Sequence, residues 1–459
     1  MLLRFALSAL LLCASVLAAD PPAEDPAVAL ARILAAKGAI STADLSAVTA
    51  AADRVGALAA ILRAKGLLND AELAQFRPAP PPAPVVNAAA PKPAQEPAPH
   101  PTLSAYGTIL MNAFYNTAAT NIQDVPLFAS KQGADPTGGD KNFGMTARQT
   151  RLGLKYQQPN VAGARLSGQF EFDLFGGKTP LGNGMDMDIF RLRLAFGRLD
   201  WKHVAFEAGQ DWALFAPLNP TSLAGFAIPD FSTSGNPWIR LPQLRAEFSG
   251  GSFLWQVAAL DPNMGDYPTG TFSTSRQPGI GERGRMPAVE SRVAWSHSHA
   301  TLGLSGHYGR GKNTPVGVDS WGVAGDYSIP LTRYFTLTGE AFEGRALGIF
   351  SVTSGESVGA VGTPGAHGVE SRGGWSQVQF NPVRQWQLNL AYGLEVPNAA
   401  QLPAGNRWRN QTYMGNVIFK LTPSVNFALE YRRMLTDYRN QQAANERGDH
   451  VNLAVGYIF

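Results

Sequence analysis

Alternation of apolar and polar residues constrains the fold of this chain more than any other feature of its sequence. In the final segment every second residue is apolar or aromatic, namely Val451, Leu453, Val455, Tyr457 and Phe459. A period of two places alternate side chains on opposite faces of a β-strand. Comparable segments recur between residues 104 and 459. The pattern therefore predicts that this region is all-β.

The expected strands number about sixteen, an even number of the kind found in membrane-spanning barrels. They cover residues 104–116, 145–156, 163–175, 188–200, 203–211, 238–249, 252–260, 288–297, 300–310, 317–329, 333–344, 367–381, 385–394, 407–420, 424–435 and 446–459. The segments between them alternate between long and short, and 311–316 is the shortest of the long set. Long external loops and short periplasmic turns alternate in outer-membrane barrels, but not in soluble β-sandwiches. We therefore expect a transmembrane antiparallel β-barrel.

Charged residues indicate which face of these strands points inward. The positions between the apolar residues carry many Arg, Lys, Glu and Asp residues. Isolated charges are costly in a dry core, whereas a water-filled lumen solvates them. We therefore expect apolar side chains to face lipid and polar ones to face the lumen. The expected outward sets include Leu152, Leu154 and Tyr156 on one strand, and Leu192, Leu194 and Phe196 on another.

Residues 1–18 have the anatomy of a secretory signal peptide. Arg4 supplies the basic start, a short apolar core follows, and a small-x-small cleavage motif ends at Ala18. Cys13, the single cysteine of the chain, lies in this segment, so the mature protein would contain no thiol. Beyond the first twenty residues no apolar run reaches the roughly 20 residues that a membrane helix needs.

Residues 19–77 are rich in Ala and contain an internal repeat, because the segment 33–40 matches the segment 61–68. Each copy indicates a helix stopped at Lys-Gly and followed by a capped second helix. A self-packed pair of helical hairpins fits this pattern, and so does a periplasmic contact or oligomerisation module. Residues 78–102 alternate Pro and Ala, which predicts a semi-rigid linker. The barrel is then expected over 103–459.

Arginines at the polar positions suggest an anion preference. Several fall near the middle of an expected strand, where rings of Arg or Lys select anions in pores. The residues expected to line the pore or to contact the solute are Arg151, Lys155, Arg165, Arg191, Arg193, Arg245, Arg292, Arg432, Glu171 and Glu247. The alternative is that Arg and Glu pair along the wall and mainly stiffen it.

The long segment 212–237 is the expected constriction of the lumen. It is almost uncharged and rich in Pro and aromatic residues, and an exposed loop would be more polar. The residues expected to narrow the pore are Phe215, Phe226, Asp230 and Phe231. Packing of this segment at a subunit interface is the alternative.

Two sets of residues carry a family resemblance. The ending Tyr457-Ile458-Phe459 resembles the C-terminal signature of bacterial outer-membrane proteins, which implies that Tyr457 and Phe459 are recognised by the insertion machinery. The runs 104–107, 146–153 and 168–173 resemble those of DcaP-like porins. That resemblance implies a homotrimeric, sixteen-stranded channel in the outer membrane of Gram-negative bacteria, surrounded by lipid and passing small anionic solutes. The helical repeats depart from the N-terminal coiled coil that this family implies.

Two other functions compete with a porin. A barrel enzyme would need a nucleophile near a histidine, but no histidine here has a Ser in a nucleophile motif, and we expect no enzyme activity. His297 and His299 lack a nearby third ligand, so no metal or cofactor is expected. The second competitor is a non-selective or structural barrel tethered to peptidoglycan through residues 20–77. The net charge of +3 is too small to indicate nucleic acid as a partner.

Overall fold

The computed structural model describes residues 26–51, 54–66, 100–131, 140–180, 186–266, 277–355, 357–359, 366–439 and 446–459. The expected signal peptide and residues 78–99 of the expected linker lie outside these ranges. The chain divides into two compact units, residues 1–83 and residues 84–459.

The first unit consists of three short helices in its described part: α2 (Pro26–Ala36), α3 (Thr42–Ala50) and α4 (Arg54–Ala64). Gly38 follows α2 with a φ of 73°, a left-handed conformation that suits glycine at a helix end. Ser41 and Asp44 form a capping box at the start of α3. Ala31, Ile40 and Val48 are buried between the helices. None of the described helices is long and apolar enough to cross a bilayer.

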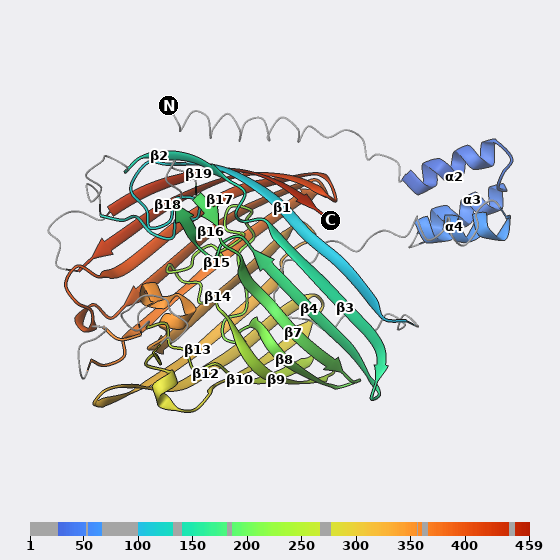
Figure 1. The fold of residues 1–459 in the computed structure, drawn as a ribbon. Coiled ribbons are helices and arrows are strands. Elements are labelled where there is room, and N and C mark those ends of the chain that lie inside the picture. The colour runs from blue at the N-terminus through green and yellow to red at the C-terminus, as the bar shows by residue number, and fades with distance from the viewer. Residues whose placement is uncertain are drawn as a thin grey trace. The chain divides into compact units, whose positions relative to one another are not determined.

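The second unit is a closed antiparallel β-barrel (Figure 1), which confirms the expected all-β fold. The described part of its sheet contains β1 (Thr102–Asn116), β2 (Asn142–Thr146), β3 (Arg151–Val161), β4 (Ala164–Asp173), β7 (Arg191–Asp200), β8 (Val204–Trp212), β9 (Arg240–Gly250), β10 (Phe253–Leu260), β11 (Ala288–His297), β12 (Ala300–Asn313), β13 (Val316–Pro330), β14 (Phe335–Arg345), β15 (Glu370–Val383), β16 (Trp386–Pro397), β17 (Arg407–Thr422), β18 (Val425–Tyr438) and β19 (Glu446–Ile458). The barrel closes where β1 pairs with β19.

The expected single strand over 145–156 is wrong, because the chain breaks it into β2 and β3. Both segments pair with β1, so together they fill one of the sixteen positions around the wall. Residues 147–150 leave the ladder between them and turn into the barrel. Gln149 is fully buried there, and its side-chain amide donates to Asn112 and to the carbonyl oxygen of Ala224.

The outward direction expected for Leu194 and Phe196 is also wrong. On β4, Glu171 pairs with Leu194 while the next residue, Phe172, pairs with Leu192, so β7 contains a bulge. A bulge of one residue moves all later side chains to the other face. Leu194 is therefore buried inside, and Phe196 packs against the same interior cluster. Leu192 points outward as expected and is 44% exposed.

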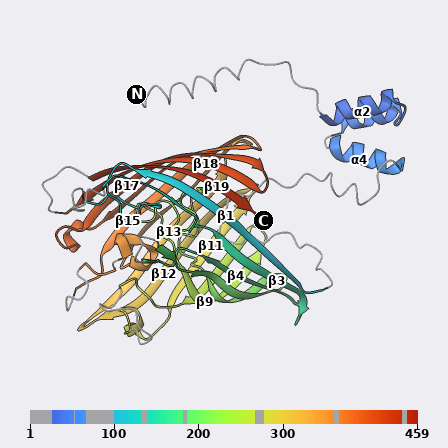
Figure 2. The same ribbon diagram turned by 45° about the horizontal axis from the view of Figure 1, so that its top comes forward.

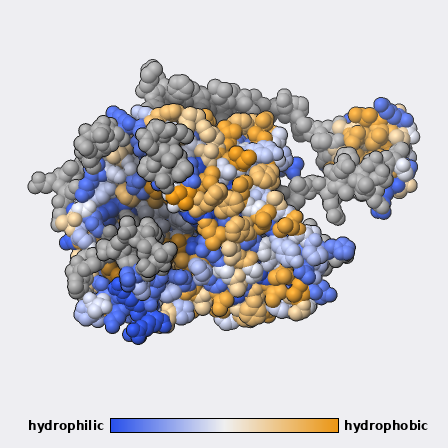
Figure 3. Space-filling view, in the orientation of Figure 1, coloured by the Kyte–Doolittle hydropathy of each residue, from blue (hydrophilic) through white to orange (hydrophobic). Residues whose placement is uncertain are grey.

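The remaining outward positions carry the predicted apolar side chains. Figure 3 shows apolar residues gathered along the flank of the barrel that faces the viewer. Leu154, Leu390 and Leu429 are among the exposed examples. Exposed aromatic residues also contact aromatic partners on neighbouring strands: Phe335 stacks on Phe380, and Trp386 packs in a tilted arrangement on Phe419.

The two ends of the barrel differ in their connections. One end, the turn end, carries short links such as 251–252 and 384–385, and the other, the loop end, carries long ones such as 261–287 and 346–369. The link 314–315 is an exception, because it joins β12 to β13 at the loop end with two residues. A small hairpin that the sequence pattern did not predict, β5 (Lys178–Pro180) with β6 (Asp186–Asp188), lies in the connection between β4 and β7.

Candidate pore constriction

Residues 213–239, which connect β8 to β9, enter the barrel and run along its inner wall. We call this segment the inner loop, and its green trace lies between the walls in Figure 2. Its backbone and the hydroxyl of Ser222 meet inward side chains from strands that are far apart in sequence. The contacts run from Glu290 on β11, through Gln377 on β15, to Glu430 on β18. The inner loop therefore follows the inner wall from β11 to β18.

Polar side chains of the wall hold the inner loop through its backbone. Glu290 accepts the N–H groups of Leu214 and Phe215 at 2.6 and 3.1 Å. Further along, wall residues bind the loop as follows: Ser305 accepts from Ala216, Glu340 from Leu218, Gln377 from Thr221, and Asn416 donates to Thr221. Buried N–H groups are costly without partners, so these side chains allow a chain without regular structure to lie inside a barrel.

The local sequence also fits this path. Gly235 has a φ of 111°, and a Cβ atom there would lie 2.1 Å from the carbonyl oxygen of Gly374 on β15. Only glycine allows both this conformation and this close approach. Apolar residues of the loop fill the space between loop and wall, as Leu218 and Phe231 do against Trp375 and Met414. The low charge of the segment is explained by this burial.

The four residues expected to narrow the pore have different surroundings. Phe215 is 1% exposed and packs on Phe350, with ring centroids 5.0 Å apart. Phe231 is buried against Trp375, and Asp230 forms an ion pair with Arg432. Only Phe226 remains partly exposed. The first three fasten the loop to the residues around it, whereas the Phe226 ring is partly exposed and lies 3.9 Å from the Arg151 guanidinium carbon.

The expected belt of arginines points inward, but each member has an acidic partner. Arg193 contacts Glu171 and Asp173, at 2.7 and 2.9 Å. The other pairs are Arg245 with Asp211 at 3.3 Å, Arg292 with Asp326 at 2.6 Å, Arg432 with Glu430 at 2.6 Å, Arg191 with Asp173 at 2.6 Å, and Arg151 with Glu171 at 3.6 Å. These guanidinium groups are therefore not the unpaired groups that an anion-binding belt would require.

Of the other residues predicted to line the pore, some belong to such ion pairs and the rest lie nearer the turn end. Lys155 is exposed, and its Nζ lies 4.6 Å from the ring centroid of Tyr106. Arg165 is exposed and lies 3.4 Å from Asp200. Glu247 is buried and accepts from Arg198 at 2.7 Å. Thus Lys155 and Arg165 are open to solvent, whereas Glu171 and Glu247 are committed to arginines.

One buried arginine that the sequence analysis missed has no acidic partner among the described residues. Arg240, the first residue of β9, is 8% exposed, and its guanidinium carbon lies 4.8 Å from the ring of Trp212 and 5.1 Å from that of Trp238. Its Nη1 atom has no hydrogen-bond partner in the described structure. Strict alternation along β9 would place Arg240 on the outer face, so the sequence pattern did not predict it as a pore-lining residue.

Arg240 belongs to a cluster with more arginines than acids, which we call the arginine cluster. The Trp212 and Trp238 rings beside Arg240 pack against Leu194, the residue that follows Arg193. The members are Arg148, Arg151, Arg191, Arg193 and Arg240, with Asp124, Glu171 and Asp173 as counter-charges. Five cations against three anions leave a net charge of +2. The carbonyl oxygens of Phe226 and Ala227 on the inner loop accept from this cluster.

Acidic and histidine side chains of the described wall, Glu290 among them, are a second kind of candidate for binding a solute or a metal ion. The carboxylate of Glu290 also contacts Nδ1 of His307 at 3.1 Å, so it is saturated by the imidazole and by the inner loop. Among the described residues, no group of three or more His, Cys, Asp or Glu side chains could hold a metal ion.

Comparison with known proteins rests on the barrel. No protein-family model matches the sequence, and no curated protein does. Among solved structures, the outer membrane channel DcaP of Acinetobacter baumannii superposes with a TM-score of 0.63 at 19% identity, covering 78% of this chain and 98% of that one. The chain shares the DcaP fold. The fold resemblance expected from the sequence is thereby confirmed.

Two further structures have the same architecture. An anion-selective porin from Comamonas acidovorans superposes with a TM-score of 0.51 at 12% identity and covers 78% of this chain and 100% of that one. OmpF of Salmonella typhi, solved with daunomycin, gives a TM-score of 0.52 at 13% identity, covering 78% and 97%. At these identities the similarity is one of fold.

Proposed function

We propose that this protein is an outer-membrane porin that passes small hydrophilic solutes by passive diffusion and prefers small anions such as carboxylates. The porin part is supported by the barrel shared with DcaP, by its apolar outer face, and by a polar interior that holds the inner loop. The porin from Comamonas acidovorans, which has the same architecture, is described as anion-selective. A channel is favoured over an enzyme.

The anion preference rests on one observation: the arginine cluster contains Arg240, which lacks an acidic partner among the described residues. The wall arginines outside this cluster, such as Arg292, are neutralised by their partners. The wall carboxylates Glu290 and Glu340 are occupied by backbone N–H groups of the inner loop and are not open to a passing solute. The uncompensated positive charge therefore lies beside Phe226, the partly exposed aromatic residue of the inner loop.

A solute carboxylate would meet Arg151 and Arg191 first, because their side chains are 20% and 24% exposed. Arg240 would add a favourable field from behind them. Binding must stay weak if the solute is to leave again, so a dissociation constant near millimolar, about −4 kcal/mol, is the expectation.

The reversal potential in a KCl gradient across a planar bilayer tests this proposal. Wild type should favour chloride, and Arg240→Gln should lose most of that preference. The variant should fold, because removing a buried charge that has no partner leaves no carboxylate unpaired. Arg372→Gln, an outward-facing arginine on β15, is the matched control and should behave as wild type. A preference for potassium in wild type would contradict the anion preference, and an unchanged potential in Arg240→Gln would contradict the role of Arg240 in it.

We further propose that the channel is a homotrimer whose N-terminal helices lie in the periplasm. Native mass spectrometry in a mild detergent should give the mass of three chains, and a monomer would count against it. The competing proposal, a structural barrel tethered to peptidoglycan through residues 20–77, needs no conductance. A reconstituted protein without channel activity would favour the tether.

A further inference from the structure

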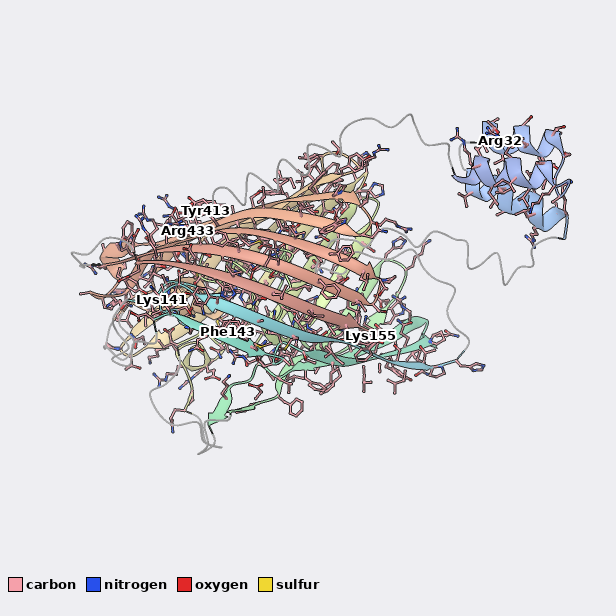
Figure 4. The ribbon with its side chains drawn as sticks, turned by 90° about the horizontal axis from the view of Figure 1, so that it is seen from above. Arg32, Lys141, Phe143, Lys155, Tyr413 and Arg433 are labelled. Carbon is pink, nitrogen blue, oxygen red and sulfur yellow. The ribbon has the colours of Figure 1, made fainter. Side chains whose placement is uncertain are left out.

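Charged residues on the outer face of the barrel occur at the loop end. On β18 and β19, Arg433, Arg447 and Asp449 point outward among exposed apolar neighbours. Lys141 precedes β2 and is also exposed. Figure 4 shows Lys141 and Arg433 at the same end of the barrel, and Lys155 toward the other end. We call Lys141, Arg433 and Arg447 the rim cations.

Strand register brings the rim cations together. Arg433 pairs across the ladder with Asp449, and the backbone N–H of Thr117 donates to the carbonyl oxygen of Asp449. The ladder between β1 and β2 ends with Asn116 opposite Asn142, so Lys141 follows beside Thr117. Neighbouring strands are about 4.8 Å apart. The row from Arg433 to Lys141 therefore spans about 14 Å, with Arg447 two residues further along β19.

These cations are less compensated than other charges on the same rim. Elsewhere on the rim, three outward arginines face acids across the ladder: Arg310 opposite Asp319, Arg372 opposite Glu343, and Arg345 opposite Glu370. Lys312, which faces Gly317, stands without an acid opposite it but has no second unopposed cation across the ladder. In the row described here, Arg447 faces Leu435. Asp449 is the one acid opposite Arg433, at 4.0 Å, and it also accepts the hydroxyl of Tyr431 at 2.7 Å. No described acid pairs with Lys141 or Arg447.

A broad apolar surface lies directly on the turn-end side of the rim cations. Phe143 and Met145 on β2 are 68% and 60% exposed, and Tyr115, Tyr431 and Val451 continue the surface over β1, β18 and β19. Figure 4 shows Phe143 beside Lys141, displaced toward the turn end. Cations above an apolar surface complement a molecule with an anionic head and hydrocarbon tails.

We propose that the rim cations bind the phosphate groups of a phosphorylated glycolipid of the outer leaflet, whose acyl chains lie along Phe143, Met145 and Val451. This inference rests on the proposed function, because it takes the loop end to face the cell exterior. Arg433 and Arg447 each present a planar fork that suits phosphate oxygens, and Lys141 adds a point charge. Asp449 and Tyr431 hold Arg433 in place.

Binding of rough-type lipopolysaccharide to the purified full-length protein in detergent tests the proposal. The variant Lys141→Gln/Arg433→Gln/Arg447→Gln should bind at least tenfold more weakly than wild type. The matched control, Arg310→Gln/Lys312→Gln/Arg372→Gln, removes three outward cations from other strands of the same rim and should bind as wild type. Dephosphorylated lipopolysaccharide should bind wild type as weakly as the triple rim variant binds the intact lipid.

Several outcomes would overturn the lipid site. Equal binding by wild type and the rim variant would do so, as would equal binding of the dephosphorylated lipid. Competition by inorganic phosphate at the concentration of the lipid would indicate an ion site, and a smaller native mass of the rim variant would indicate a contact between copies of the chain. Channel conductance, measured in parallel, should be unchanged in the rim variant. A conducting wild type that binds no lipid refutes the lipid site alone, whereas a wild type that does not conduct refutes the porin.

Discussion

At the scale of single residues, most inward arginines pair with acids of the wall, whereas Arg240 contributes positive charge without an acidic partner among the described residues. The sequence does not distinguish these two roles. Alternation along a strand correctly places Arg193 and Arg292 on the inner face, since it depends only on a local period of two. Their acidic partners, Glu171 and Asp326, depend on the register between strands. Arg240 escapes the pattern altogether, because it stands where the inner loop joins β9. Thus the polarity of the lumen is predictable, but its unpaired charge is not.

Asp44 in the helical unit gives a pH-dependent prediction. The backbone N–H of Ser41, then its hydroxyl, and then the Lys65 ammonium lower the pKa of Asp44 from 3.8 to about 2. Because the folded pKa lies below the unfolded one, the carboxylate stabilises the unit above about pH 4. That contribution falls as the pH drops toward 2. The helical signal in circular dichroism of the full protein should therefore melt a few degrees lower near pH 2 than at pH 7.

Two variants separate the cap from the ion pair. Asp44→Asn should melt lower at neutral pH and should respond less to acid, because it has no carboxylate to protonate. Lys65→Gln keeps the capping box and should retain most of the acid response. An Asp44→Asn protein that lost stability between pH 4 and pH 2 as wild type does would rule out this account.

At the scale of elements, the departures from the predicted strands are concentrated around the inner loop. The break between β2 and β3 turns Gln149 inward, where it donates to Ala224 and accepts from Ala227 of the loop. The bulge in β7 directs both Arg193 and Leu194 inward, toward the loop residues Ala227 and Ile228. A period-two pattern cannot show a one-residue bulge, because the residues on either side still alternate. Both irregularities therefore bring wall side chains into contact with the inner loop.

Removing the first anchor of the inner loop should loosen it. Glu290 accepts two loop N–H groups and contacts His307, and hydrogen bonds to a charged group contribute about 1.5–3 kcal/mol each. We expect Glu290→Leu to leave these donors unpaired. Single-channel recordings should then show a larger mean conductance with more open-state noise. Glu343→Leu, which removes an outward carboxylate of β14, should leave both unchanged.

A Glu290→Leu variant that conducts as wild type would contradict the role proposed for the start of the inner loop. If Glu290→Leu folds into a heat-stable barrel with the conductance and noise of wild type, the start of the inner loop does not control the open path. The narrowest point would then be set further along, near Phe226 and the arginine cluster.

At the scale of the whole molecule, the sequence predicted the architecture well because it depends on repetition. Sixteen wall positions follow from many short alternating segments, and an error of a few residues in one segment does not change the count. The small hairpin of β5 and β6 was missed, and the link expected over 311–316 has only two residues, because loop ends do not repeat. The segments of the first unit show no period of two, and its helices follow instead from Gly38 and the cap at Ser41.

The closure of the barrel carries a prediction about topology. Backbone hydrogen bonds in both directions join Gly107, near the start of β1, to Phe459, so the two ends of the barrel chain lie together at the turn end (Figure 1). Short turns face the periplasm in outer-membrane barrels. The segment 20–100, which precedes β1, should therefore lie in the periplasm. Protease added to intact cells should leave this segment uncut, and the same protease should remove it once the outer membrane is permeabilised. The barrel should survive both treatments, and cleavage of the segment in intact cells would reverse the orientation, which would also place the rim cations on the wrong leaflet.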